Sequence, residues 1–155
     1  MYAILDIEAT GGKVGEESII EIAVYKYDGK EIVDQFISLV NPEKKIDQYV
    51  QRLTHISDKM VLTAPKFHEV AKRIVEITDD CILVGHNVMF DYRMLKQEFD
   101  RLGYNYEKEW IDTFEYSEKL IPGLPSYSLG KLCESLGIVV TDRHRACLLY
   151  TSPSP

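Results

Sequence analysis

The first ten residues constrain the chain more than any other stretch. Residues 2–10 form an apolar run that carries two carboxylates, Asp6 and Glu8, and a pair of glycines follows. Side chains alternate along a strand, so Asp6 and Glu8 share one face and Ile7 points to the other. Two neighbouring acids that lose hydration repel each other unless a cation compensates them or one is protonated. A divalent cation fits, because Mg²⁺ and Mn²⁺ prefer carboxylate oxygens. The alternative is a strand that frays into solvent.

Length and composition indicate one globular domain. The chain has 155 residues, of which 45% are hydrophobic and 28% are charged. Without an apolar run of membrane-spanning length or a basic leader, we expect a cytoplasmic protein with no membrane partner. The three cysteines are far apart, which argues against disulfides or a thiolate metal site. The formal charge of −7 argues against broad electrostatic binding of nucleic acid, but it permits an enzyme that holds phosphate through bound cations.

Alternating apolar residues predict two further strands after the first. One is expected over residues 18–28 and is half-buried; the other is expected over residues 31–40. Asp28 and Gly29 between them are a strong hairpin signal. The residues expected on one face of the second strand are Ile20, Ile22 and Val24. The opening is therefore predicted to be three antiparallel strands, with the first beside the second.

The remainder of the chain predicts helices around two short strands. The wholly apolar run at residues 81–84 indicates a central parallel strand buried on both faces, and residues 110–111 indicate another strand. Helices are expected over residues 46–55, from 63–65 through 78, and over 88–102, 113–120 and 128–136, with a loop at 122–125. This order predicts an α/β fold with a mixed sheet, antiparallel at its opening and parallel beyond, flanked by helices.

A second acidic position follows the central strand. Asn87 is expected to cap the next helix and Asp91 to lie one turn inside it. If the central strand pairs with the first strand, Asp91 converges on Asp6 and Glu8. An aspartate in a first helical turn often only compensates the helix dipole. Three carboxylates together suit two hard cations, which can stabilise the attacking and leaving oxygens of a phosphodiester. The attacking water needs a base, for which His144 is the candidate, although a lone histidine is more often structural.

Five short motifs occur along the chain in a fixed order. They are residues 6–12 (DIEATGG), 19–23 (IIEIA), 86–91 (HNVMFD), 112–113 (DT) and 144–146 (HRA). Together they resemble the DEDD exonucleases, and more closely the His-bearing branch that includes the proofreading epsilon subunit of bacterial DNA polymerase III. The resemblance covers residues 2–146. It implies a ribonuclease-H-like fold and metal-dependent 3′→5′ removal of nucleoside monophosphates from nucleic-acid ends.

The resemblance also implies roles for single residues. Asp6, Glu8 and Asp91 match metal ligands for two Mg²⁺ or Mn²⁺ ions, His144 matches the general base, and Asp112 looks architectural. The residues that match the substrate-binding stretches are Thr10, Gly11, Ile56, His86 and Asn87. The implied partners are the 3′ end of single-stranded nucleic acid, with DNA favoured in proofreading or repair, and a DNA polymerase or another replication protein.

The chain departs from the family pattern near its end. The last motif places an aspartate five residues after its histidine, and Leu149 stands there. Residues 147–155 carry no charge, contain two prolines and resemble the translation of an adapter used in sequencing libraries. We therefore expect an exonuclease domain at residues 1–146 that is C-terminally truncated, followed by a non-native tail. With three acids in place of four, the chain is expected to bind one metal passably and the other weakly, and to be nearly inactive.

Other functions stay open at this point. Loss of the fourth acid would favour a non-catalytic nucleic-acid-binding or scaffold module with the same fold. A metal-dependent hydrolase of small phosphates is a further alternative. An exoribonuclease is equally compatible with the motifs, because discrimination between DNA and RNA depends on side chains placed near the sugar.

Overall fold

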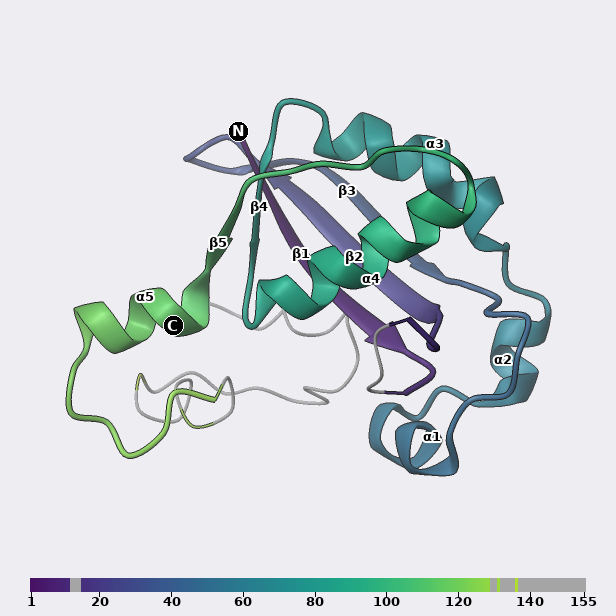
Figure 1. The fold of residues 1–155 in the computed structure, drawn as a ribbon. Coiled ribbons are helices and arrows are strands. Elements are labelled where there is room, and N and C mark those ends of the chain that lie inside the picture. Colours follow the sequence, from purple (N-terminus) through teal and green to yellow (C-terminus); the bar gives the residue numbers. More distant parts are fainter. Residues whose placement is uncertain (12–14, 129–130, 132–135, 137–155) are drawn as a thin grey trace.

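The computed structural model describes residues 1–11, 15–128, 131 and 136, which form a sheet flanked by helices (Figure 1). The strands are β1 (Tyr2–Ala9), β2 (Ile19–Tyr27), β3 (Ile32–Leu39), β4 (Ile82–Gly85) and β5 (Trp110–Asp112). The helices are α1 (Gln48–Thr54), α2 (Asp58–Leu62), α3 (Phe67–Thr78), α4 (Val88–Arg101) and α5 (Thr113–Leu120). The helix predicted over residues 128–136 falls almost wholly outside the described residues, as does the tail at 147–155.

The sheet has the order β3-β2-β1-β4-β5, which places β1 in the centre. Strand β2 pairs antiparallel with β1 and β3, whereas β4 runs parallel to β1 and β5 parallel to β4. The predicted hairpin is present: the Asp28 carboxylate accepts hydrogen bonds from the N–H groups of Lys30 and Glu31 at 2.8 and 2.9 Å. The predicted mixed α/β fold is thus confirmed. Because β1 and β4 are parallel, their carboxyl ends lie at the same end of the sheet.

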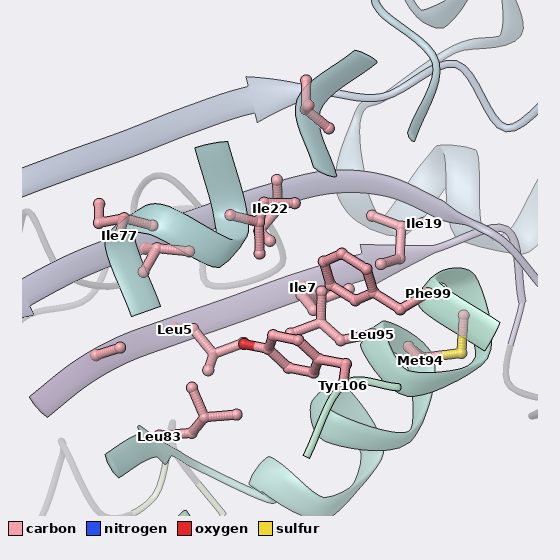
Figure 2. Close-up of a cluster of buried hydrophobic side chains, with 14 of the residues drawn as sticks. Leu5, Ile7, Ile19, Ile22, Ile77, Leu83, Met94, Leu95, Phe99 and Tyr106 are labelled. Carbon is pink, nitrogen blue, oxygen red and sulfur yellow. The ribbon is translucent and has the colours of Figure 1, made fainter. Parts of the chain in front are cut away.

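Helices α3 and α4 cover one face of the sheet, and α4 crosses in front of β1 and β2 in Figure 1. The core lies between these two layers. The Phe99 ring of α4 stacks on Tyr106 at 4.5 Å between centroids and meets Phe67 of α3 edge-on at 5.0 Å. Figure 2 shows Phe99 and Tyr106 beside Leu5 and Ile7, two buried residues of β1. This apolar contact fixes α4 against β1.

Strand β2 differs from its prediction in two ways. It is buried on both faces from Ile19 to Tyr25, whereas a half-buried strand was expected. In addition, a bulge opposite Glu8 and Ala9 breaks the alternation, so that Ile19 and Ile22 join the main core. Ile20 instead packs in a second cluster, with Ile46, Ile56 and Val61. The prediction that Ile20 shares a face with Ile22 is therefore wrong.

The helices between the hairpin and β4 start later than predicted. Helix α1 occupies residues 48–54 of the predicted 46–55 segment. The five-residue helix α2 was not predicted. Helix α3 begins at Phe67 with Lys66 as its N-cap, so Pro65 precedes the helix and does not lie in its first turn. The reason is a non-local contact: the Pro65 carbonyl accepts a hydrogen bond from Asn41 N–H at 2.8 Å, and Asn41 forms a parallel bridge with Lys66.

The later elements match their predictions closely. Helix α4 ends at Arg101, with Leu102 as C-cap and Gly103 at a φ of 74°. Strand β5 and helix α5 occupy the expected segments. Strand β4 is less buried than predicted, since Ile82 and Val84 are half-buried while Leu83 is fully covered. Within the described residues, no helix combines the length and the apolar character that crossing a bilayer requires.

Candidate active site

Strand β1 carries Asp6 and Glu8 on the face of the sheet opposite to α3 and α4. Ile7 between them is buried in the core, as the alternation of the strand predicts. Across the antiparallel pairing, Asp6 lies opposite Ala23 and Glu8 lies opposite Glu21. Directly opposed residues of neighbouring strands share a face. Three acids therefore occupy this face at the carboxyl end of β1.

Asp91 reaches the same region from the first turn of α4. Its side chain is 4% exposed. The path from β4 into α4 passes Gly85, where an added Cβ would lie 3.0 Å from the Leu5 carbonyl oxygen and 3.2 Å from the Val88 side chain. Gly85 thus permits β4 and the start of α4 to approach β1 closely. The chain then turns at Asn87, whose φ of 60° is left-handed.

Asp112 fixes this turn from the end of β5. Its Oδ1 atom accepts hydrogen bonds from Asn87 N–H at 3.0 Å and from Phe114 N–H at 2.9 Å. The first bond holds the turn before α4, and the second caps α5. Asn87 is the N-cap of α4 as predicted, but its side chain makes no capping bond. The contacts of Asp112 fit the architectural interpretation of this residue.

Asp6 and Asp91 hold their protons more tightly than aspartates usually do. Burial, followed by the charges of Asp6, Glu8 and Asp112, raises the pKa of Asp91 well above its usual value. Burial is also the main cause that raises the pKa of Asp6 to about 7; the Ile7 N–H opposes the shift, and Glu21 adds to it. The Asp91 carboxyl is therefore close enough to Asp6, Glu8 and Asp112 for their charges to repel.

Two carboxylate oxygens here have no hydrogen-bond partner among the described residues. Oδ2 of Asp6 and Oδ2 of Asp91 are buried and accept no hydrogen bond within the described part of the chain. Buried polar atoms without partners are rare, and each calls for an explanation. As the side chains stand, the described residues contain no group of three or more His, Cys, Asp or Glu arranged to hold a metal ion. The donors nevertheless fit a hard cation chemically, because they are buried, mutually repelling carboxylate oxygens.

The predicted substrate-binding residues differ in how accessible they are. Thr10 is 2% exposed and its hydroxyl bonds to Glu17 and Ser18, while Gly11 beside it is half-buried. Asn87 is exposed. Ile56 is fully buried in the second core cluster, and its predicted contact with a nucleotide base stays a prediction.

His86 is engaged within the protein at both ring nitrogens. Nδ1 lies 2.9 Å from the Thr113 hydroxyl, and Nε2 lies 2.8 Å from the Tyr127 carbonyl oxygen. The ring also meets Phe114 edge-on, with 5.4 Å between centroids. These contacts tie the end of β4 to the start of α5 and to the loop after it. They fit a bracing role, and the predicted contact of His86 with substrate stays a prediction.

The predicted base and the position of the expected fourth acid cannot be placed. His144 and Leu149 lie outside the described residues. The residue that the prediction missed is Glu21, which is 2% exposed, lies opposite Glu8 and influences Asp6. A signal was present in the sequence, since Glu21 interrupts a run of isoleucines that indicates burial.

Solved structures similar to this one include several nucleases. Exonuclease X, in complex with 5′ overhanging duplex DNA, has a TM-score of 0.75 and 26% identity over 96% of this chain and 84% of its own. The nuclease domain of 3'hExo, a DEDDh family member bound to rAMP, has a TM-score of 0.78 and 22% identity over 97% and 85%. E. coli Exonuclease I with a dT13 oligonucleotide has a TM-score of 0.84 and 18% identity over 97% and 39%. The last two show the fold alone, which is the ribonuclease-H-like fold predicted.

Sequence comparison gives the family. The 3′-5′ exonucleases DinG of Staphylococcus saprophyticus and Staphylococcus aureus are each 36% identical to this chain over 146 residues. The match covers 94% of this chain but 16% of each relative, so the chain spans about a sixth of their length. The sequence profile of the exonuclease family RNase T matches residues 3–148. The predicted resemblance to DEDD-type 3′-5′ exonucleases is thereby confirmed, and the chain belongs to the RNase T exonuclease family.

Proposed function

We propose that this chain is a metal-dependent 3′→5′ exonuclease domain that releases nucleoside monophosphates from nucleic-acid 3′ ends. The observation that carries the proposal is the pair of unpartnered, buried carboxylate oxygens on Asp6 and Asp91. A purely structural role gives no reason to keep repelling acids buried, because their burial costs stability. In a family of exonucleases, a site for cations gives that reason.

Asp6, Glu8 and Asp91 are the residues that would hold the cations. Two Mg²⁺ or Mn²⁺ ions, when bound, would supply positive charge that stabilises the attacking and leaving oxygens of a phosphodiester. The chain's own contribution is placement: β1 presents Asp6 and Glu8, and the Gly85–Asn87 turn presents Asp91. His144 would take the proton from the attacking water.

Leu149 is the reason to expect weak activity from this sequence. The family pattern has an aspartate there, and leucine offers no ligand oxygen. The decisive test is digestion of a 3′-labelled DNA oligomer by the unaltered chain, by Leu149→Asp and by Leu149→Asn, each with Mg²⁺, Mn²⁺ or chelator. We expect Leu149→Asp to raise the rate at least about 100-fold. The isosteric amide serves as control and should stay slow. Robust digestion by the unaltered chain would disprove the predicted impairment.

His144 can be tested in the same background. In Leu149→Asp, replacing His144 by Ala should lower the rate about 100-fold. Replacing the exposed His68 by Ala is the matched control and should not change the rate. An unchanged rate in the His144 variant would show that another group acts as the base.

DNA is the favoured substrate and proofreading or repair the favoured setting. Exonuclease X and Exonuclease I were solved with DNA, and 3'hExo with the ribonucleotide rAMP, so ligands with either sugar occur among the structural neighbours. Matched DNA and RNA oligomers digested side by side would decide between them. A polymerase or other replication partner, and a cytoplasmic location, stay predictions.

The second candidate function is a nucleic-acid-binding module without catalysis. Leu149 favours it, because the fourth acid is missing. This function predicts that the unaltered chain and Leu149→Asp both bind a DNA oligomer and that neither digests it. Digestion by Leu149→Asp would show that the rest of the site is catalytically competent, and it would contradict this second function.

A further inference from the structure

Hydrogen bonds join Thr10, the residue directly after β1, to Glu17 and Ser18. Thr10 N–H donates to the Ser18 carbonyl at 2.8 Å, and Ser18 N–H donates to the Thr10 hydroxyl oxygen at 3.0 Å. The Thr10 hydroxyl in turn donates to the Glu17 carboxylate. Residues 15–18, here called the return segment, therefore fix the backbone at the end of β1, where the predicted nucleotide-binding residues Thr10 and Gly11 lie.

Gln97 of α4 holds the return segment at two points. Its Nε2 donates to the Glu17 carbonyl at 2.7 Å, and its Oε1 accepts from Gly15 N–H. Gly15 has a φ of 101°, a left-handed conformation that side chains disfavour. The amide of one glutamine thus satisfies a backbone donor and a backbone acceptor. An amide side chain carries a donor nitrogen and an acceptor oxygen side by side at its end.

Arg101 secures the same segment one helical turn further on. Its Nη1 atom lies 3.2 Å from the Ser18 hydroxyl and 2.5 Å from Glu98 Oε1, and its Nη2 atom lies 3.3 Å from the Glu17 carbonyl oxygen. Glu98 is buried, and its carboxylate orients the Arg101 guanidinium. The return segment is consequently bound to two successive turns of α4.

Helix α4 therefore serves two parts of the site at once. Its first turn carries Asp91, and its last turns hold the segment that fixes Thr10 and Gly11. We propose that Gln97 is a positioning residue for the 3′-terminal nucleotide: it keeps the end of β1 in register with the Asp91-bearing helix. The inference rests on the proposed exonuclease function, because that function places a 3′ end at Thr10 and Gly11.

Binding without turnover tests this role. The probes are a 5′-fluorescein DNA oligomer with a free 3′ hydroxyl and a circular single-stranded DNA of the same composition, both in Ca²⁺. Two lost hydrogen bonds predict that Gln97→Ala binds the linear oligomer about tenfold more weakly. Gln97→Glu keeps the acceptor but sets a carboxylate against the Glu17 carbonyl, so it should lose at least as much. Affinity for the circle should not change in either variant.

Lys96→Ala is the matched control. Lys96 neighbours Gln97 on α4, but its amine donates to Asn105, away from the return segment, at 3.3 Å. It should bind both DNAs as the unaltered chain does. A second measurement, amide hydrogen exchange at Gly15 and Ser18, should be about tenfold faster in Gln97→Ala and unchanged in Lys96→Ala.

The outcomes separate the two proposals. If the unaltered chain prefers the linear oligomer and Gln97→Ala keeps that preference, Gln97 does not position the terminal nucleotide, even when exchange at the return segment is faster. If the unaltered chain binds linear and circular DNA equally, the proposed 3′-end function fails, and the ligand assigned to the return segment fails with it. Loss of the linear preference in Gln97→Ala and Gln97→Glu, but not in Lys96→Ala, supports both.

Discussion

Odd-numbered and even-numbered residues of β1 lie in opposite environments. Leu5 and Ile7 are covered by α3 and α4 in an apolar cluster. Asp6 and Glu8, their immediate neighbours, face the other way, where Asp6 has an unpartnered oxygen and Glu8 lies opposite another acid. One strand thus supplies a stabilising face and an electrostatically unfavourable face.

The difference separates what folds the chain from what it is folded to do. Burial of large apolar side chains contributes roughly 1.5–3 kcal/mol each, which offsets the cost of the acids. Repelling buried carboxylates contribute nothing to folding, and proteins retain such groups mainly at functional sites. If this comparison is right, truncating a core side chain must lower the free energy of unfolding, whereas neutralising one of the repelling acids must raise it.

The largest expected effect belongs to the apolar face. Replacing Phe99 by Ala should lower the free energy of unfolding by about 3–5 kcal/mol, because the ring fills the space between Tyr106 and Phe67. Urea denaturation measures the loss. The control is Tyr104→Ala, since Tyr104 also contacts Phe99 but is 46% exposed, and it should cost under about 1 kcal/mol. Equal losses in the two variants would contradict the core described for α4.

The next effect belongs to the acid face and has the opposite sign for stability. In the Leu149→Asp background, Asp91→Asn should lower the digestion rate at least about 100-fold and Mn²⁺ affinity about 10- to 100-fold. Without metal, the same variant should unfold at a higher temperature, because one of the repelling charges is gone. Asp100→Asn, an exposed position on the same helix, should change none of the three. A lower melting temperature for Asp91→Asn would show that its charge is compensated.

A third effect is the dependence of stability on pH. Folding raises the pKa of Asp6 from 3.8 to about 7, so the folded state binds the proton more tightly than the unfolded chain does. The corresponding stability is fully present below pH 3.8 and is lost as the pH rises towards 7. In chelator, the unaltered chain should therefore lose on the order of 4 kcal/mol relative to Asp6→Asn across this window. At pH values above this window, Mn²⁺ should restore most of the stability that is lost. Parallel pH profiles for the two proteins would contradict the shift.

Local patterns explain why much of the fold was predictable. The alternation around Asp6, the Asp28–Gly29 turn and the glycine after α4 each depend on residues close in sequence, and each was confirmed. The presence of Asp91 near Asp6 also followed, because two neighbouring parallel strands end on the same side. Whether these acids hold a metal stays a prediction.

The misses come from contacts between residues far apart in sequence. Ile19 and Ile20 are both apolar, so no pattern reveals that a bulge sends them to different clusters. The late start of α3 depends on Asn41, which bonds to Pro65. The run of isoleucines around Glu21 indicates burial, but its position beside Glu8 depends on the pairing of β2 with β1.

The smallest expected effect concerns two hydroxyl groups buried in the core, those of Tyr106 and Thr78. It tests whether the core accommodates them because they are hydrogen-bonded to each other. The Tyr106 hydroxyl lies 2.9 Å from the Thr78 hydroxyl, which donates its own hydrogen to the Ile74 carbonyl at 2.7 Å. Tyr106 must then donate to Thr78, and burial, the main cause, raises its pKa to about 12. Replacing Tyr106 by Phe should lower the free energy of unfolding by about 1 kcal/mol. Adding Thr78→Val should cost less than the sum of the single losses, because the same bond is removed twice. Strict additivity would mean that the two hydroxyls act independently, and the contrast with the Asp6 oxygen, which accepts no hydrogen bond from the described residues, would then lose its basis.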